Sequence, residues 1–101
     1  MAFDVTIDER AIDQLQNLPK KIGRRLFRRI EALASNPRPA GSEKVVTTTD
    51  LRKVRSGDYR IIYAILGREV YVLKVADRKD VYRALGSLQT RLARIAGKRK
   101  K

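Results

Sequence analysis

The stretch from Leu51 to Tyr63, LRKVRSGDYRIIY, restricts the fold of this chain more than any other. Two runs rich in β-branched and aromatic residues meet there at Gly57 and Asp58. Glycine readily takes the positive φ that a type II′ turn requires at its first central position. The stretch therefore predicts a β-hairpin with a two-residue loop.

This loop sets the register of the two strands. The predicted pairs are Ser56 with Tyr59, Arg55 with Arg60, Val54 with Ile61 and Lys53 with Ile62. Paired residues share a face, so one face gathers Lys53, Arg55 and Arg60, and the other is apolar, with Val54, Tyr59, Ile61 and Tyr63. Like charges directly opposite one another weaken a sheet, and such local conflicts are typical of functional sites. The alternative is a set of solvated cations on an exposed strand face.

The charge of the chain points to a polyanionic partner. The 101 residues include 24 Lys and Arg against 11 Asp and Glu, a formal net charge of +13. Such an excess favours binding to nucleic acid or to an acidic protein surface, with an affinity that falls as salt rises. The length and the 43% hydrophobic content predict one folded domain, residues 1–96, followed by a basic tail, 97–101.

The chain contains neither Cys nor His. This excludes disulfides, thiolate metal sites, the usual zinc sites and His-dependent nucleophiles or acid–base pairs. We expect no cofactor and no metal, so that any chemistry uses Lys, Arg, Tyr, Asp or Glu. We also expect a cytoplasmic protein, because no apolar run has the length of a signal peptide or a membrane span.

The first 35 residues predict a strand and two helices. Phe3, Val5 and Ile7 alternate with polar residues, as in a half-buried strand. Asp8 is a candidate N-cap for a helix that ends before Pro19. A second helix, from Lys20 to about Ser35, carries an apolar stripe of Ile22, Leu26, Phe27, Ile30 and Leu33.

The remaining face of the second helix is basic. We expect Lys20, Lys21, Arg24 and Arg28 to bind RNA, because a face with charges of one sign forgoes the i,i+4 ion pairs of an ordinary solvated helix. A solvated face is the alternative.

The C-terminal half predicts a meander and a last helix. Residues 36–42 form a loop, and residues 43–50 either extend the next strand or lead irregularly into it. Further strands span residues 61–66 and 70–76. The loop between them has two or three residues, and the two lengths would place Lys74 and Arg78 on opposite faces of the sheet. The sequence leaves this choice open. From Asp80, a helix with Val81, Leu85, Leu88, Leu92 and Ile95 packs on the sheet or binds a partner, and Gly97 ends it.

Three runs of the sequence are characteristic: LASNP (33–37), VRSGDYRIIY (54–63) and VADRKDVY (75–82). Together with this order of elements, they resemble the RelE/ParE toxin superfamily over roughly residues 3 to 88. The resemblance implies an α+β, RelE-like fold, with an N-terminal strand and two helices packed on an antiparallel meander and a C-terminal helix. Members of the superfamily include ribosome-dependent mRNA-cleaving toxins and non-nucleolytic gyrase inhibitors.

The RelE-like branch implies a catalytic groove formed by Lys53, Arg55, Arg60, Arg78 and Tyr82. Its toxins cleave mRNA in the ribosomal A site through attack of the 2′-hydroxyl on the adjacent phosphate, without a metal. Lys53 is then the candidate base, Arg60 and Arg55 hold the phosphate, and Arg78 stabilises the transition state or leaving oxygen. Tyr82 stacks on a base or orients the hydroxyl. The chain departs from many relatives at Asp77, where they have His.

The same resemblance implies the partners of the chain. We expect a toxin of a type II toxin–antitoxin system that forms a complex with an acidic antitoxin and acts on the ribosome and mRNA. Two alternatives stay open: a ParE-like inhibitor of DNA gyrase, which needs no catalytic groove, and a small basic RNA-binding module.

Overall fold

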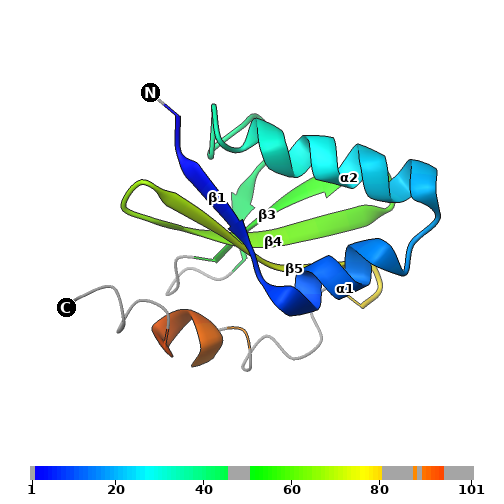
Figure 1. Cartoon of the computed structure of the whole chain (residues 1–101). Helices are drawn as coiled ribbons and strands as arrows, with labels where there is room; N and C mark the ends of the chain where they lie inside the picture. Colours follow the sequence, from blue (N-terminus) through cyan, green and yellow to red (C-terminus); the bar gives the residue numbers. More distant parts are fainter. Residues whose placement is uncertain (1, 46–50, 81–87, 89, 95–101) are drawn as a thin grey trace.

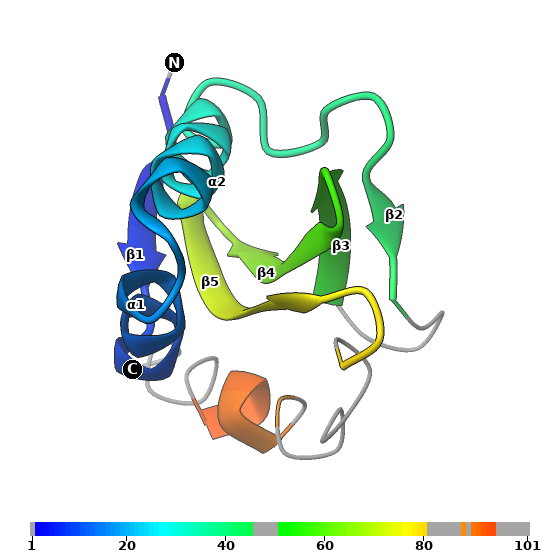
Figure 2. The ribbon, with the colours of Figure 1, turned by 90° about the vertical axis from the view of Figure 1, so that its right-hand side faces the viewer.

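The computed structural model describes residues 2–45, 51–80, 88 and 90–94. The order of elements is β1 (Asp4–Ile7), α1 (Glu9–Gln16), α2 (Lys20–Ala32), β2 (Glu43–Lys44), β3 (Leu51–Ser56), β4 (Tyr59–Leu66) and β5 (Glu69–Asp77). One sheet contains the strands in the order β1-β5-β4-β3-β2 (Figure 1). Helices α1 and α2 cover one face of this sheet, and a helical segment at residues 88 and 90–94 lies on the other (Figure 2). The predicted α+β fold is confirmed.

The N-terminal strand adds a parallel edge to an otherwise antiparallel sheet. β1 pairs with β5 from Asp4 opposite Glu69 to Ile7 opposite Val72. The sequence predicted the strand but not its position in the sheet. Asp8 then caps α1 as predicted, because its side chain accepts a hydrogen bond from the backbone N–H of Arg10 at 3.1 Å.

Helix α2 rests on the sheet through fewer residues than its pattern indicated. Leu26 and Ile30 are buried among core residues of β3, β4 and β5, but Phe27 is 45% exposed. The prediction that Phe27 belongs to the buried stripe was therefore wrong, because Phe27 lies at the margin of the packed face, where it lines a hollow with Val5 and Ile7 of β1. The helix also ends at Ala32, three residues early, where i→i−3 hydrogen bonds form a tighter turn.

The predicted hairpin is confirmed in its register. Gly57 has a φ of +61°, and the pairs of β3 with β4 are those expected, from Ser56 opposite Tyr59 to Lys53 opposite Ile62. Val54 and Ile61 pack under α2. The opposite face is only partly cationic, since Ile62 is fully buried there.

A β-bulge decides the face of Lys74. The loop between β4 and β5 has two residues, with Leu66 opposite Glu69, but the register shifts between Ile62 and Tyr63. Beyond this shift Ile62 pairs with Lys74, so Lys74 shares a face with Lys53 and Arg60.

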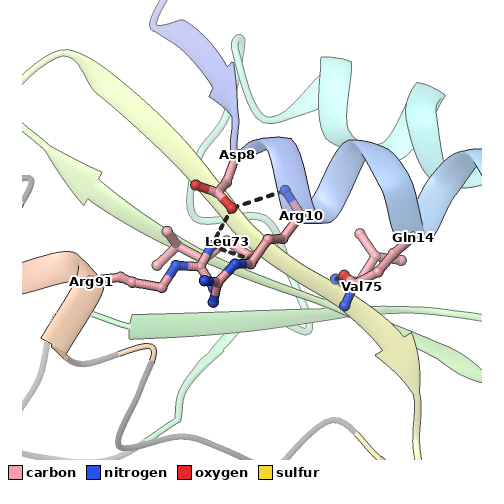
Figure 3. Close-up of polar contacts among 6 residues, drawn as sticks. All are labelled: Asp8, Arg10, Gln14, Leu73, Val75 and Arg91. Atoms are coloured by element: carbon pink, nitrogen blue, oxygen red, sulfur yellow. Dashed lines mark hydrogen bonds and ion pairs between the residues drawn. The ribbon is translucent and has the colours of Figure 1, made fainter.

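The second face has an apolar cluster of its own. Leu88 and Leu92 are buried against residues of β3, β4 and β5, namely Leu51, Ile62, Ala64 and Leu73. Two side chains outside the sheet also contact β5 (Figure 3): Arg91 bonds to Asp8 and to the carbonyl of Leu73, and Gln14 accepts the N–H of Val75 at 2.8 Å. The C-terminal segment is thereby linked to both β5 and the N-cap of α1.

Some predictions fall outside the described residues. Val81, Leu85 and Ile95 of the predicted last helix, and the basic tail at 97–101, are among them. The domain boundary at residue 96 therefore stays a prediction. Within the described part of the chain, no helix has the length and apolar content that crossing a membrane requires.

Candidate functional site

A cleft of about 450 Å³ opens where the short β2 stops beside β3. β2 pairs only with Arg52 and Lys53, so the remainder of the β3 edge has no strand beside it within the described residues. The cleft is lined by the cations Arg29, Lys53, Arg55 and Arg60 together with Ala40, Gly41, Glu43 and Val54. Four of its eight lining residues are therefore basic and one is acidic.

Three of these cations come from the hairpin, as the sequence predicted. Arg55 lies directly opposite Arg60, and Lys53 is two residues from Arg55 on the same face. The Arg60 guanidinium is held near the turn, because its Nη1 donates to the carbonyls of Tyr59 at 3.1 Å and Gly57 at 3.3 Å. Arg55 is exposed. Arg60 is thus oriented by the backbone, with further N–H donors left for a ligand.

The fourth cation, Arg29, was not predicted to belong to the site. It comes from α2, and its neighbour one turn earlier, Arg25, lies next to the hairpin, where a Cβ on Gly57 would be 3.2 Å from Arg25 Nη1. The sequence signal was available, since Arg25 and Arg29 directly precede the buried residues Leu26 and Ile30. These positions flank the buried stripe and so lie close to the sheet.

The helix cations that the sequence predicted to bind RNA lie elsewhere on α2. Lys20, Lys21, Arg24 and Arg28 are exposed, and the last two line a separate hollow with Leu15, Gly23 and Phe27. RNA binding by these four residues stays a prediction, and it concerns a surface apart from the cleft.

Arg78 lies beside the tip of the hairpin. Its backbone N–H donates to the carbonyl of Asp58 at 2.9 Å, just past the last pair of β4 and β5. Two residues earlier, Ala76 pairs with Arg60, and Arg78 itself lies in the turn that follows the end of β5 at Asp77. Tyr82, the remaining predicted catalytic residue, is outside the described residues.

The loop that forms one wall of the cleft is held by hydrogen bonds to the sheet. The hydroxyl of Tyr63 donates to the carbonyl of Pro37 at 2.7 Å, and Arg52 Nη2 donates to Ser42 Oγ at 2.9 Å. Both contacts join the segment 37–42 to the sheet. The wall at Ala40 and Gly41 is therefore held in place beside the cations.

One carboxylate contacts the cationic group. Glu43 Oε2 lies 3.9 Å from Lys53 Nζ, and the Glu43 side chain is 68% exposed. An exposed pair at this distance contributes little, about 0–1 kcal/mol, so an incoming anion can replace it. Guanidinium groups donate paired hydrogen bonds to phosphate and carboxylate oxygens, so this cleft presents donors that suit an oxyanion.

Known proteins resemble the chain in both sequence and fold. A family model described as the ParE toxin of type II toxin–antitoxin systems, parDE, matches residues 5–82. A putative toxin RelE1 of Methanocaldococcus jannaschii is 27% identical in an alignment of 88 residues that covers 82% of this chain and 98% of the relative.

Two solved structures are similar over most of their length. The RelE–RelB complex of Pyrococcus horikoshii aligns at a TM-score of 0.68 and 32% identity over 83% of this chain and 100% of the other. A free mutant of Escherichia coli RelE aligns at a TM-score of 0.70 and 23% identity over 90% of this chain and 97% of the other. At this identity the similarity shows the fold alone.

Proposed function

The chain belongs to the RelE/ParE superfamily of toxins from type II toxin–antitoxin systems, and from this we propose that it is a ribosome-dependent endoribonuclease that cleaves mRNA in the A site. The observation that carries the proposal is the cleft in which Lys53, Arg55 and Arg60 come together. A toxin that acts only by binding another protein has no need of such a group. Relatives named RelE support the same reading.

The proposed reaction needs only groups of this chain and of the RNA. Lys53 takes the proton of a 2′-hydroxyl, whose oxygen attacks the adjacent phosphorus. Arg60 and Arg55 donate hydrogen bonds to the phosphate oxygens, on which charge builds up in the transition state. The bond from phosphorus to the 5′-oxygen breaks, and that oxygen takes up a proton, which leaves a 2′,3′-cyclic phosphate and a 5′-hydroxyl.

Two further residues complete the proposed site. Arg78 stabilises the transition state or the leaving 5′-oxygen, for which its backbone position beside Asp58 at the hairpin tip is suitable. Tyr82 stacks on a base or orients the attacking hydroxyl.

Primer extension on an mRNA in a programmed translation reaction tests the proposal. We expect wild type to produce A-site cuts only when ribosomes are present, and Arg60→Ala to reduce them by about 100-fold or more, the range of losses seen when a transition-state donor is removed. Arg10→Ala, on exposed α1, is the matched control for the loss of one positive charge. Equal cutting by wild type and Arg60→Ala would remove Arg60 from the site.

Inhibition of DNA gyrase without catalysis is the second candidate. The observation in its favour is that the matching family model is described as the ParE toxin. If wild type arrests growth while mRNA stays intact in the primer-extension assay, loss of DNA supercoiling by gyrase is the expected effect. The two candidates are thus separated by the same preparation of protein.

An acidic antitoxin is the proposed partner. The net charge of +13 favours an acidic surface, and the similar protein from Pyrococcus horikoshii was solved as a complex of RelE with RelB. The antitoxin would cover the basic surface and displace the C-terminal segment around residues 85–95. The apolar cluster beneath Leu88 and Leu92 would then become available to it.

A further inference from the structure

Arg29 reaches the cleft from a different layer of the molecule than the hairpin cations do. Helix α2 packs on the sheet face that carries Val54, whereas Arg55 and Arg60 belong to the opposite face. Arg29 nevertheless lines the same cleft, because the cleft lies at the open edge of β3. A ligand held by the hairpin pair on one side therefore meets Arg29 on the other side of that edge.

We propose that Arg29 binds a second phosphate of the RNA, the one next to the phosphate that is cleaved. The inference rests on the proposed function in taking RNA as the ligand. Arg29 is then a positioning residue: it holds the chain of the mRNA where it passes around the β3 edge, and the hairpin residues act on the scissile group.

The size of the cleft supports two ligand groups rather than one. The cleft of about 450 Å³ is larger than a single phosphate group requires. Arg55 and Arg60 are directly paired and can share one phosphate, since the Cβ atoms of such pairs lie about 5 Å apart. Arg29 is separated from them by the thickness of the sheet edge.

Arg29 also lacks an acidic partner. Among the described residues no carboxylate or carbonyl bonds to its guanidinium, although the side chain is partly buried. The one carboxylate of the cleft, Glu43, lies against Lys53. A partly buried guanidinium that has lost water without gaining a protein partner favours an anionic ligand.

RNA fits this site better than an acidic peptide does. Apart from Ala40 and Val54, the lining contains no apolar side chain, and it contains no aromatic one. Protein interfaces depend on apolar or aromatic anchors, whereas a backbone of regularly spaced phosphates needs only cations placed along its path.

A comparison of Arg29→Gln with Arg10→Gln on chemically altered mRNA tests the inference. Each variant loses one charge from a helix, and Arg10 lies on α1, away from the cleft. Synthetic mRNAs carry one neutral methylphosphonate at a phosphate next to the cleaved bond, and single-turnover cleavage is measured on programmed ribosomes. On unmodified mRNA we expect Arg29→Gln to slow cleavage about tenfold, as for the loss of one charged hydrogen bond, and Arg10→Gln to match wild type.

The modified mRNAs then identify the contact. At one neighbouring position, neutralising the phosphate should slow wild type and leave Arg29→Gln no slower than it already is. If Arg29→Gln behaves like Arg10→Gln, or if its defect adds to every methylphosphonate alike, the inference is overturned.

A binding assay separates failure of this inference from failure of the proposed function. Fluorescence anisotropy with a labelled 2′-O-methyl RNA trinucleotide, which cannot be cleaved, and with hexaglutamate reports binding alone. Weaker RNA binding by Arg29→Gln than by Arg10→Gln supports the phosphate site even if wild type cuts no mRNA. Equal RNA binding by the two variants, or a loss confined to hexaglutamate, overturns it.

Discussion

Gln14 supports the sheet at a single backbone group. Pairing of β1 with β5 ends at Val72, and three residues later the N–H of Val75 donates to the Gln14 side chain of α1 at 2.8 Å. A side chain thus replaces the missing strand partner just after the bulge that orients Lys74.

Gln14→Leu removes this acceptor and should lower the free energy of unfolding by about 1–3 kcal/mol, the cost of an unpaired donor away from water. Amide hydrogen exchange at Val75 should become faster. Gln14→Glu keeps an acceptor oxygen and is the matched control. If Val75 exchanges at the wild-type rate in Gln14→Leu, the contact does not hold the strand.

The cations of the cleft show why it is harder to predict which residues line a site than which helices and strands form. Lys53, Arg55 and Arg60 could be assigned to one face because a two-residue turn determines their register. Arg29 and Arg28 are adjacent in a basic run, and the predicted stripe, because it included Phe27, did not distinguish Arg29, which lines the cleft, from Arg28, which lines a separate hollow. The rotation of α2 on the sheet depends on which apolar residues find space in the core, and it left Phe27 outside.

At the level of elements, local patterns predicted α1, α2 and the strands β1, β3, β4 and β5, but neither the short β2 nor the long-range pairing. The loop at Gly67 has the two residues that one reading of the sequence allowed, yet the bulge reverses the face of every later residue in β5. Bulges lack a strong sequence signal, because the extra residue is set by contacts with neighbouring strands. The parallel pairing of β1 was likewise unpredictable from its own residues.

Among the described residues, the C-terminal segment contacts the rest of the fold through an ion pair, a hydrogen bond and a small apolar cluster. Arg91 bonds to Asp8 and to the Leu73 carbonyl at 3.2 Å (Figure 3). Leu88 and Leu92 bury their side chains on the sheet. Asp8 also caps α1, so its replacement must preserve that role.

Asp8→Asn keeps the cap, since Asn caps about as well as Asp, but removes the charge that Arg91 contacts. Hydrogen exchange in residues 88–94 should speed up several-fold, consistent with a partly exposed pair worth about 1 kcal/mol or less. Added salt should produce part of the same change in wild type. Arg94→Gln, an exposed neighbour, is the control. Unchanged exchange in Asp8→Asn would mean that the apolar contact alone holds the segment.

At the scale of the whole molecule, the apolar packing and the cations occupy different parts of the fold. The helices α1 and α2 fill one face of the sheet, the C-terminal segment covers the apolar part of the other, and the cations gather at the uncovered end of the hairpin. With a net charge of +13, the molecule as a whole attracts polyanions. In the cleft, the cations form a defined arrangement of hydrogen-bond donors. Cleavage is proposed to occur there.

The most direct test of that claim replaces one hydroxyl group of the substrate by hydrogen. An mRNA with a single 2′-deoxyribose at the cleaved nucleotide is presented to the protein on programmed ribosomes, beside the all-ribose mRNA. We predict that the all-ribose mRNA is cut to a 2′,3′-cyclic phosphate and a 5′-hydroxyl, and that the substituted mRNA stays intact at that position. Cutting of the substituted mRNA at an undiminished rate, or no cutting of either mRNA by a protein that still arrests growth, would contradict the account.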